Sequence, residues 1–405
     1  MYSNVPIANA PQVIEPSLES LKTGGQSFPK KLKTAIVHDW LPVYAGAERV
    51  LEQMINVIPE SEIYSLIDFL PDDQRHFLQG KTVSTSFIQK LPFARKKYRF
   101  YLPFVPFATE QFNLTNYDVV VSSSYVAAKG VLTTAEQLHV SYVHSPVRYA
   151  WDLHFQYLKE GGLETGLKGL FAKIILHYMR LYDVSCANRV DAYIANSRTV
   201  ARRIWKTYRR RAEVVYPPVD TDAFSFCEDK EDFYLTASRM VPYKKIDLIV
   251  EAFAKMPDKK LIVIGDGPDY EKIAAKAMPN IQMLGYQPFE ELKSYMRRAR
   301  AFVFAAEEDF GIVPVEAQAC GTPVVAFGKG GATETIIPGE TGIFFFEQNV
   351  ESLKEAVQTL DQTYSRLSPT RIRENALRFS VERFQENFEN ALGRAYAEFL
   401  SADSN

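Results

Sequence analysis

The sequence has few residues of the kinds that build metal centres and disulfide frameworks. Its 405 residues include three cysteines, at Cys186, Cys227 and Cys320, and six histidines. The cysteines lie far apart, which excludes a disulfide framework and favours a reducing, cytoplasmic compartment. No cluster of cysteine and histidine has the spacing of a metal site, so we expect neither a metal nor another cofactor.

A large net charge and long apolar runs are missing too. The formal net charge is −2, which gives no indication of nucleic acid as a partner. No run of ~18 or more apolar residues occurs, so a membrane-spanning helix is not expected. Residues 1–30 contain Gly24-Gly25 and several prolines, and they lack the basic start and apolar core of a secretory signal. We expect a disordered tail there.

The chain after residue 30 alternates short apolar strands with helical patterns, which is typical of parallel sheets flanked by helices. The pair Pro217-Pro218 can continue neither a helix nor a central strand, so we place a hinge there. The expected fold is α/β, with two Rossmann-like domains at residues 31–216 and 217–383. Strands are predicted at residues 32–37, 63–67, 117–122, 139–144, 192–195, 233–236, 261–264, 281–284, 301–304 and 323–326.

A turn with two carboxylates follows the strand at residues 301–304. Glu308 lies at the loop tip, and Glu316 lies in the first turn of a helix that Pro314 should begin and Gly321 should end. Both carboxylates can face a crevice at the carboxyl end of a parallel strand, where α/β sheets bind ligands. The alternative is that Glu308 is solvated and that Glu316 merely complements the helix dipole.

The segment resembles the signature of retaining glycosyltransferases of family 4, in which seven residues separate two glutamates. The resemblance implies the GT-B fold, two Rossmann-like domains with a cleft between them. It also implies a final helix, residues 384–405, that crosses back to the first domain. Glu308 would contact the donor sugar and Glu316 the ribose of the nucleotide. The turn that would approach the sugar and the phosphate consists of Phe310, Gly311 and Ile312.

Two further segments match this family. Residues 38–50 look like its donor-side glycine loop, in which Gly46 is retained and Ala45 replaces a glycine of many members. Residues 142–152 are similar to bacterial mannosyltransferases that extend lipid-linked sugars for capsule, exopolysaccharide or O-antigen. The resemblance therefore implies GDP-mannose as the nucleotide sugar and a lipid-linked saccharide as the acceptor. The acceptor-side candidates are Asp39 and Arg148.

Breaking a sugar–nucleotide bond leaves negative charge on the diphosphate, which fixed cations can stabilise. Arg239 and Lys244 follow the first strand of the second domain and match the family's diphosphate contacts, while Lys245 replaces a glycine of many members. Basic residues at a helix start oppose the helix dipole, so a bound anion explains them better than a solvated surface does. Because these cations can replace a metal, we interpret the metal-like sequence Asp220-Thr221-Asp222 as a structural turn.

Several more candidates lie at strand ends. Gly265 and Gly267 would let the nucleotide approach the backbone, although an ordinary turn explains them nearly as well. Tyr286 follows the next strand and can border the base. His144 ends a strand of the first domain, and the resemblance implies that it contacts the donor sugar. A purely structural histidine is the alternative.

Residues 90–107 mix basic and aromatic side chains. Lys96, Lys97 and Arg99 lie beside Tyr98 and Phe100. Such a surface can lie on anionic lipid, as a peripheral contact with a membrane. The alternative is an ordinary helix that buries its aromatic residues and exposes its cations.

The sequence thus predicts a retaining glycosyltransferase that moves a hexose from a nucleotide sugar to a lipid-linked saccharide, at the inner face of the cytoplasmic membrane. Two other classes compete with it: a GT-B-fold nucleotide-sugar epimerase and a catalytically silent sugar-nucleotide-binding subunit. The glutamate pair and residues 142–152 fit an epimerase poorly, and turnover of a donor would exclude the silent subunit.

Overall fold

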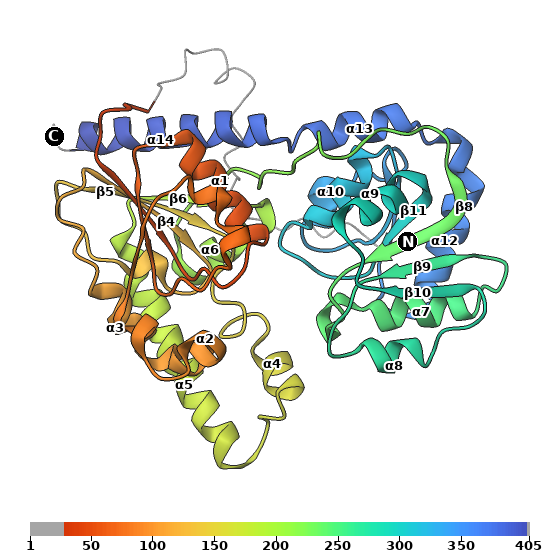
Figure 1. Cartoon of the computed structure of the whole chain (residues 1–405), viewed down its shortest axis with the longest axis horizontal. Helices are drawn as coiled ribbons and strands as arrows, with labels where there is room; N and C mark the ends of the chain where they lie inside the picture. The colour runs from red at the N-terminus through yellow and green to blue at the C-terminus, as the bar shows by residue number, and fades with distance from the viewer. Residues whose placement is uncertain (1–27, 403–405) are drawn as a thin grey trace.

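The computed structural model describes residues 28–402, so nearly all of the predicted tail lies outside the described residues. The described chain forms two parallel β-sheets, each flanked by helices. Helices α13 (Pro369–Leu377) and α14 (Val381–Ala402) run along both domains (Figure 1). These features confirm the predicted α/β fold with two Rossmann-like domains.

The first sheet has seven strands in the order β3-β2-β1-β4-β5-β6-β7. All neighbouring strands are parallel, and the central strands β4 and β5 are buried along their whole length, as expected for a sheet covered on both faces. β3 and β7 were not predicted, because edge strands this short carry little apolar pattern. The bounds are β1 Thr34–His38, β2 Glu62–Ser65, β3 Val83–Thr85, β4 Val119–Ser124, β5 Leu138–Val143, β6 Ala192–Ala195 and β7 Glu213–Val214.

The second sheet has six parallel strands in the order β10-β9-β8-β11-β12-β13. In both sheets the order reverses beside the first strand of the domain, which is where open α/β sheets bind ligands. β13 was not predicted. The bounds are β8 Glu231–Ala237, β9 Leu261–Ile264, β10 Ile281–Gly285, β11 Ala299–Phe304, β12 Val324–Phe327 and β13 Gly342–Phe345.

The helices up to α11 lie between strands in sequence, whereas α12, α13 and α14 follow the last strand. Helices cover the faces of both sheets (Figure 1). Helix α10 begins two residues before the predicted start, because Gly311 takes a φ of 85° and caps the helix, which leaves Pro314 inside the first turn. The bounds are α1 Gly46–Val57, α2 Ala94–Lys97, α3 Val105–Glu110, α4 His154–Glu160, α5 Gly166–Ser185, α6 Arg198–Tyr208, α7 Ile246–Ala254, α8 Tyr270–Ala274, α9 Phe289–Arg298, α10 Ile312–Ala319, α11 Ala332–Thr335, α12 Val350–Thr363, α13 Pro369–Leu377 and α14 Val381–Ala402.

The last helix, α14, follows the second domain in sequence and packs on the first. Phe384, Phe388 and Leu392 are buried in one cluster with Ile36 of β1 and Met54 of α1. Burying a large apolar side chain stabilises a protein by about 1.5–3 kcal/mol, so these contacts hold the end of the chain firmly against the first domain.

Candidate active site

Two helices begin at the facing ends of the two sheets. Helix α1 starts at Gly46 after β1, and α10 starts at Ile312 after β11. A Cβ atom on Gly46 would lie 3.3 Å from Cδ1 of Ile312, so the two helix starts nearly touch across the domain interface. Because the first N–H groups of a helix lack intrahelical partners and attract anions, the contact brings together two helix ends that can accept an anion. Ala45 is extended, with a φ of −141°, so this position needs no glycine.

The loops that follow the adjacent strands β8 and β11 carry the predicted cations and the predicted sugar-binding carboxylate. Lys244 Nζ forms an ion pair with Oε1 of Glu308, and both side chains are largely buried. Arg239 is exposed and, among the described residues, has no ion-pair partner. Lys245 takes a φ of 57°, the left-handed conformation that the family's glycine would favour. Lys245 therefore keeps the backbone conformation that a glycine would adopt at this position. Lys244, and not Lys245, forms the ion pair with the Glu308 carboxylate.

The second carboxylate of the motif bonds to the facing domain. Arg49 of α1 donates a hydrogen bond of 2.8 Å to Oε1 of Glu316, whose side chain is only 6% exposed. Burial raises the pKa of the Glu316 carboxyl above its ordinary value, and the Arg49 guanidinium lowers it in part. The sequence analysis did not single out Arg49, because nothing near it in sequence indicates a partner in the other domain.

The strand-end glycines are required by the packing of the chain itself. Gly265 has a φ of 128°, and a Cβ there would lie 1.9 Å from the carbonyl oxygen of Ser238. Gly267 approaches Met240 in the same way, at 2.4 Å from the carbonyl oxygen. Ser238 and Met240 are the two neighbours of Arg239 in sequence. The glycines therefore hold the loop that carries the exposed Arg239 side chain. Close approach of a nucleotide remains a prediction.

The aromatic candidates differ in exposure. Tyr286 is 77% exposed and free to border a ligand. Phe310 is only 3% exposed, and its ring packs against Tyr216 and Phe379 at centroid distances of 5.7 and 5.4 Å. The Phe310 ring therefore belongs to the core and only its backbone lies at the turn, so the approach of this turn to the donor stays a prediction.

The two first-domain candidates at strand ends occupy different environments. Asp39 is fully buried, and its carboxylate accepts hydrogen bonds of 2.5–2.7 Å from four consecutive backbone N–H groups, those of residues 125–128. This geometry makes Asp39 an organiser of the loop after β4, which corrects the acceptor-side expectation. His144 is partly exposed and bonds through Nε2 to Ser123 Oγ at 2.8 Å. Burial lowers the pKa of His144 to about 3, so the ring is neutral at physiological pH.

Arg148 is one of several side chains that join the two domains. Its guanidinium lies 3.5 Å from the Asp309 carboxylate, and Arg203 of α6 forms an ion pair with the same carboxylate. Glu334 of α11 accepts hydrogen bonds of 2.7 and 2.9 Å from the first N–H groups of α6, at Arg198 and Thr199. Arg203 and Glu334 belong to no recognisable motif, so the sequence offered no signal for either.

The Asp220 segment forms a turn, in which Asp220 accepts a hydrogen bond of 3.1 Å from the N–H of Ala223. Asp220 also lines a pocket of about 580 Å³ at the hinge, beside Tyr44 and Arg49. Across residues 28–402, no group of three or more His, Cys, Asp and Glu side chains is arranged to hold a metal ion.

The basic and aromatic stretch forms α2 and the 3₁₀ turn after it. Lys96, Lys97 and Arg99 are exposed. Tyr98 is buried, but Phe93 and Phe100 are 78% and 77% exposed. Lys97 Nζ lies 6.0 and 5.9 Å from the centroids of these two phenylalanine rings. Cations and apolar rings therefore share one surface here, unlike an ordinary helix that buries its aromatic residues.

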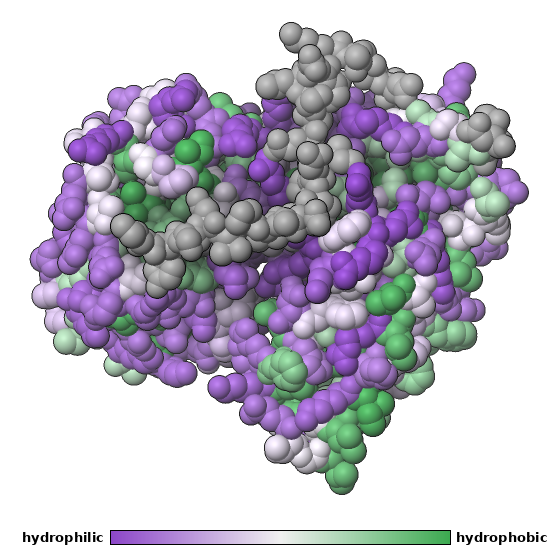
Figure 2. All heavy atoms as spheres, turned by 180° about the vertical axis from the view of Figure 1, so that it is seen from behind, coloured by the Kyte–Doolittle hydropathy of each residue, from purple (hydrophilic) through white to green (hydrophobic). Residues whose placement is uncertain are grey.

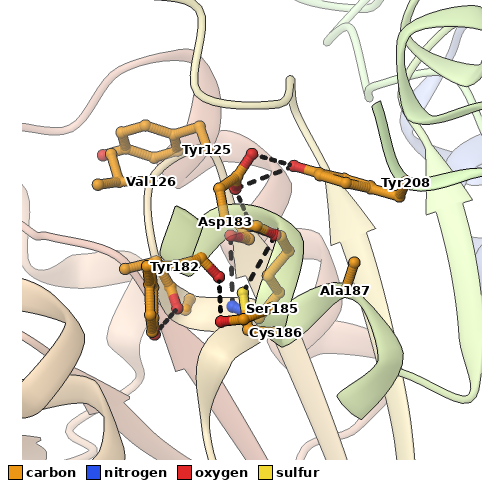
Figure 3. A network of polar contacts seen from close by, with 12 residues as sticks. Tyr125, Val126, Tyr182, Asp183, Ser185, Cys186, Ala187 and Tyr208 are labelled. Carbon is orange, nitrogen blue, oxygen red and sulfur yellow. Dashed lines mark hydrogen bonds and ion pairs between the residues drawn. The ribbon is translucent and has the colours of Figure 1, made fainter. Parts of the chain in front are cut away.

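A second exposed apolar surface, which the sequence analysis missed, lies along one face of helix α5. The opposite face of α5 packs inward through Leu176 and Met179. Asp183 anchors the end of the helix, since it accepts hydrogen bonds from the hydroxyl of Tyr208 (Figure 3). It also pairs with buried Lys129. Figure 2 shows apolar side chains gathered at the lower tip of the first domain, where α5 begins. The exposed side chains of this α5 stripe are Leu167, Leu170, Phe171, Ile174, Tyr178 and Leu181.

None of the helices in residues 28–402 is long and apolar enough to cross a membrane.

The structure defines a class of protein built from two parallel α/β domains that meet at the carboxyl ends of their strands, with two helix starts and fixed cations at the meeting point. Residues 44–223 match the family described as Glycosyltransferase Family 4, and residues 220–378 match the Glycosyl transferases group 1 family. The chain belongs to the family 4 glycosyltransferases with the GT-B fold.

Individual relatives agree with this family. The chain is 32% identical to an uncharacterized glycosyltransferase of Methanocaldococcus jannaschii over 42% of this chain and 49% of the relative. It is 34% identical to a GDP-mannose-dependent phosphatidylinositol monomannoside mannosyltransferase of Corynebacterium glutamicum, over 32% of this chain and 38% of the relative. The chain thus spans about half or less of the length of these curated relatives.

Solved structures show the same fold along nearly the whole chain. An Anabaena protein solved with UDP-glucose has a TM-score of 0.63 and 18% identity, covering 91% of this chain and 99% of that one. Sucrose-phosphate synthase from Thermosynechococcus elongatus has a TM-score of 0.69 and 17% identity, covering 91% of this chain and 100% of that one. At such identities the likeness shows the fold alone.

Proposed function

We propose that the protein is a retaining glycosyltransferase that moves a hexose from a nucleotide sugar to a lipid-linked saccharide. The observation that carries the proposal is the meeting of two helix starts, at Gly46 and Ile312, beside the cations of the β8 loop and the Lys244–Glu308 pair. This arrangement supplies N–H groups and positive charge for a diphosphate, and a carboxylate for the sugar.

In this proposal the chemistry depends on stabilising the leaving group. Arg239 and Lys244 neutralise the negative charge that forms on the diphosphate as the sugar–phosphate bond breaks. Glu308 binds the sugar, and Glu316 binds the ribose. The acceptor hydroxyl attacks the face that the diphosphate leaves and passes its proton to the departing phosphate oxygen. No metal is required, because the two cations are part of the chain.

Mannose from GDP-mannose is the first donor to test. Residues 142–152 resemble bacterial mannosyltransferases, and the Corynebacterium relative is described as GDP-mannose-dependent. A panel of GDP, UDP and ADP sugars should be screened by thermal shift, since a ligand at 100 times its Kd stabilises the native state by about 2.7 kcal/mol. The proposal expects one nucleotide sugar to stabilise the protein and to be turned over. A panel in which none binds would exclude it.

Turnover also separates the competing classes. An epimerase would convert the donor into a second nucleotide sugar or an isomeric free sugar without an acceptor. A silent subunit would bind the donor and leave it intact. A transferase should release the nucleoside diphosphate and should do so faster when a lipid-linked saccharide is present.

The exposed surfaces support the proposed contact with an anionic membrane. Lys96, Lys97 and Arg99 lie beside exposed Phe93 and Phe100, and the α5 stripe exposes six further large apolar side chains. The sole carboxylate of α5 is buried, so the exposed charges of this helix are all positive. An apolar face bordered by cations complements anionic lipid, into which apolar side chains insert while cations stay with the headgroups.

The contribution of the α5 stripe can be measured by vesicle co-sedimentation. Each apolar side chain that leaves water contributes about 1.5–3 kcal/mol, so Leu167→Gln with Phe171→Gln should weaken binding by roughly 100-fold or more. This loss should persist at high salt, because it is not electrostatic. Leu377→Gln, at an exposed apolar position on α13 of the other domain, is the matched control and should bind as the wild type. Equal binding by all three proteins would remove α5 from the contact.

A further inference from the structure

A row of buried polar side chains connects the start of α1 with His144. Glu48 accepts a hydrogen bond of 3.0 Å from the N–H of Ala45, and its other carboxylate oxygen lies 3.6 Å from Nε2 of His38. His38 bonds through Nδ1 to Ser123 Oγ at 3.0 Å. The same hydroxyl bonds to Nε2 of His144 at 2.8 Å. The row therefore runs from the helix start that faces Ile312 to the partly exposed histidine.

The inner members of this row are closed to water. His38 is 0% exposed and Glu48 is 3% exposed. Nε2 of His38 has no hydrogen-bond partner among the described residues, and the Glu48 carboxylate is the charge that faces it. A proton on Nε2 is attracted by that carboxylate, whereas a lone pair there would be repelled. The electrostatics therefore favour Nε2 over Nδ1 as the nitrogen of His38 that carries a single ring proton.

One hydroxyl proton then decides the state of the second ring. Because Nδ1 of His38 has no proton, it must accept the hydrogen bond from Ser123. The Ser123 oxygen is then left to accept from His144, whose proton must lie on Nε2. Nδ1 of His144 is bonded to no described residue and is not among the buried atoms without partners, so solvent reaches it.

We propose that Glu48, acting through His38 and Ser123, fixes the tautomer of His144 and leaves Nδ1 of His144 as a hydrogen-bond acceptor. Glu48, His38 and Ser123 are positioning residues in this scheme. An unprotonated nitrogen can accept a hydrogen bond from a hydroxyl group of a sugar, which an N–H cannot do. This use of the tautomer rests on the proposed function, whereas the tautomer itself does not.

Glu48→Gln gives a sharp test, because it should invert the whole row. The glutamine carbonyl can still accept from the N–H of Ala45, and its NH₂ group then donates to Nε2 of His38. His38 must now carry its proton on Nδ1 and donate to Ser123, which donates to Nε2 of His144. The His144 proton is displaced to Nδ1, and the acceptor is lost.

Long-range ¹H–¹⁵N spectra of ¹⁵N-histidine protein report which ring nitrogen carries the proton, and a His144→Asn variant assigns the signal. We expect protonated Nε2 in the wild type and protonated Nδ1 in Glu48→Gln. The value of kcat/KM in Glu48→Gln should fall by up to about tenfold. Glu52→Gln is the matched control on the same helix. Its carboxylate bonds to the hydroxyl of Tyr44, so the His144 signal should not change.

The wild-type spectrum tests the scheme even if Glu48→Gln does not fold. Protonated Nδ1 in the wild type would overturn the proposal, and so would an unchanged tautomer in a folded Glu48→Gln variant. If the tautomer inverts but the wild type turns over no donor, the row is as proposed and the proposed function is wrong.

Discussion

The most direct test of the proposed chemistry is to remove the two fixed cations one at a time. Arg239 is exposed with no ion-pair partner among the described residues, and Lys244 is paired with Glu308. If both stabilise the departing diphosphate, Arg239→Ala and Lys244→Ala should each lower kcat about 100-fold. That factor corresponds to about 2.7 kcal/mol of lost transition-state stabilisation, the scale of one preorganised charge or hydrogen-bond donor.

The structure separates this loss from damage to the fold. Arg239→Ala removes an exposed side chain, so the free energy of unfolding should change by no more than about 0.5 kcal/mol. Lys244→Ala leaves the Glu308 carboxylate without its partner. Because that side chain is largely buried but keeps 19% exposure, water solvates it only in part, and we expect a cost of about 1–3 kcal/mol.

Lys245→Gly is the matched control. Lys245 is the neighbour of Lys244 and has a φ of 57°, which costs a side-chain residue about 1–2 kcal/mol. Glycine relieves that cost but loses entropy on folding, so stability should rise by about 1 kcal/mol or stay unchanged. Turnover should remain close to wild type, since Lys244 is the lysine that reaches Glu308.

The assay is steady-state release of nucleoside diphosphate at saturating donor, with unfolding by urea measured on the same samples. Wild-type kcat in a folded Arg239→Ala or Lys244→Ala protein would refute the assignment of that cation. A large loss in Lys245→Gly, with unchanged stability, would show that the wrong lysine was chosen.

The remaining predictions concern metal, membrane and pH. Transfer should persist in excess EDTA, because fixed cations neutralise the diphosphate; complete loss that Mg²⁺ or Mn²⁺ restores would show that a metal is needed. Changing Lys96, Lys97 and Arg99 to Glu should release the protein from anionic vesicles at low salt, since each cation contributes roughly 1 kcal/mol to binding. Donor hydrolysis in solution should be unaffected. Sedimentation with vesicles that is unchanged and insensitive to salt would argue against an electrostatic contact. Burial lowers the pKa values of His139 and His144 from 6.5 to about 4 and about 3, so the stability that they contribute is complete above pH 6.5 and is lost as the pH falls. Unfolding near pH 5 should therefore take up about one proton at each ring, a slope of roughly 2.7 kcal/mol per pH unit for both, and His139→Asn should halve that slope in urea titrations.

Local pattern was enough to predict much of this protein. Parallel strands buried on both faces appear in a sequence as short apolar runs, so the central strands of both sheets were found from β1 onward. Glycines and prolines mark turns by their backbone limits alone, which is why Gly311 and Gly321 were correctly placed around a helix. The family resemblance rests on the same short-range features, since its motifs lie within single strand–turn–helix units.

Contacts between distant residues were decided only by the tertiary structure. Arg49 and Glu316 are 267 positions apart, and no local rule pairs them. The Phe310 ring lies in the core because it packs on Tyr216 and Phe379. The Asp39 carboxylate accepts hydrogen bonds from four backbone N–H groups in the loop after β4. In each case the side chain's chemistry was readable from its type, but its partner depended on how the chain folds back.

Exposure is the other property that the sequence could not determine. Helix α5 is apolar on more than one face, and a periodic pattern does not tell which face meets the core and which meets solvent. Only the packing of Met179 and the anchoring of Asp183 show that the stripe at Leu167 and Phe171 faces outward. The sequence by itself determined the fold class, the family and the residue types at the strand ends. The tertiary structure decided which of those residues meet one another and which meet water, because burial and pairing depend on the whole chain.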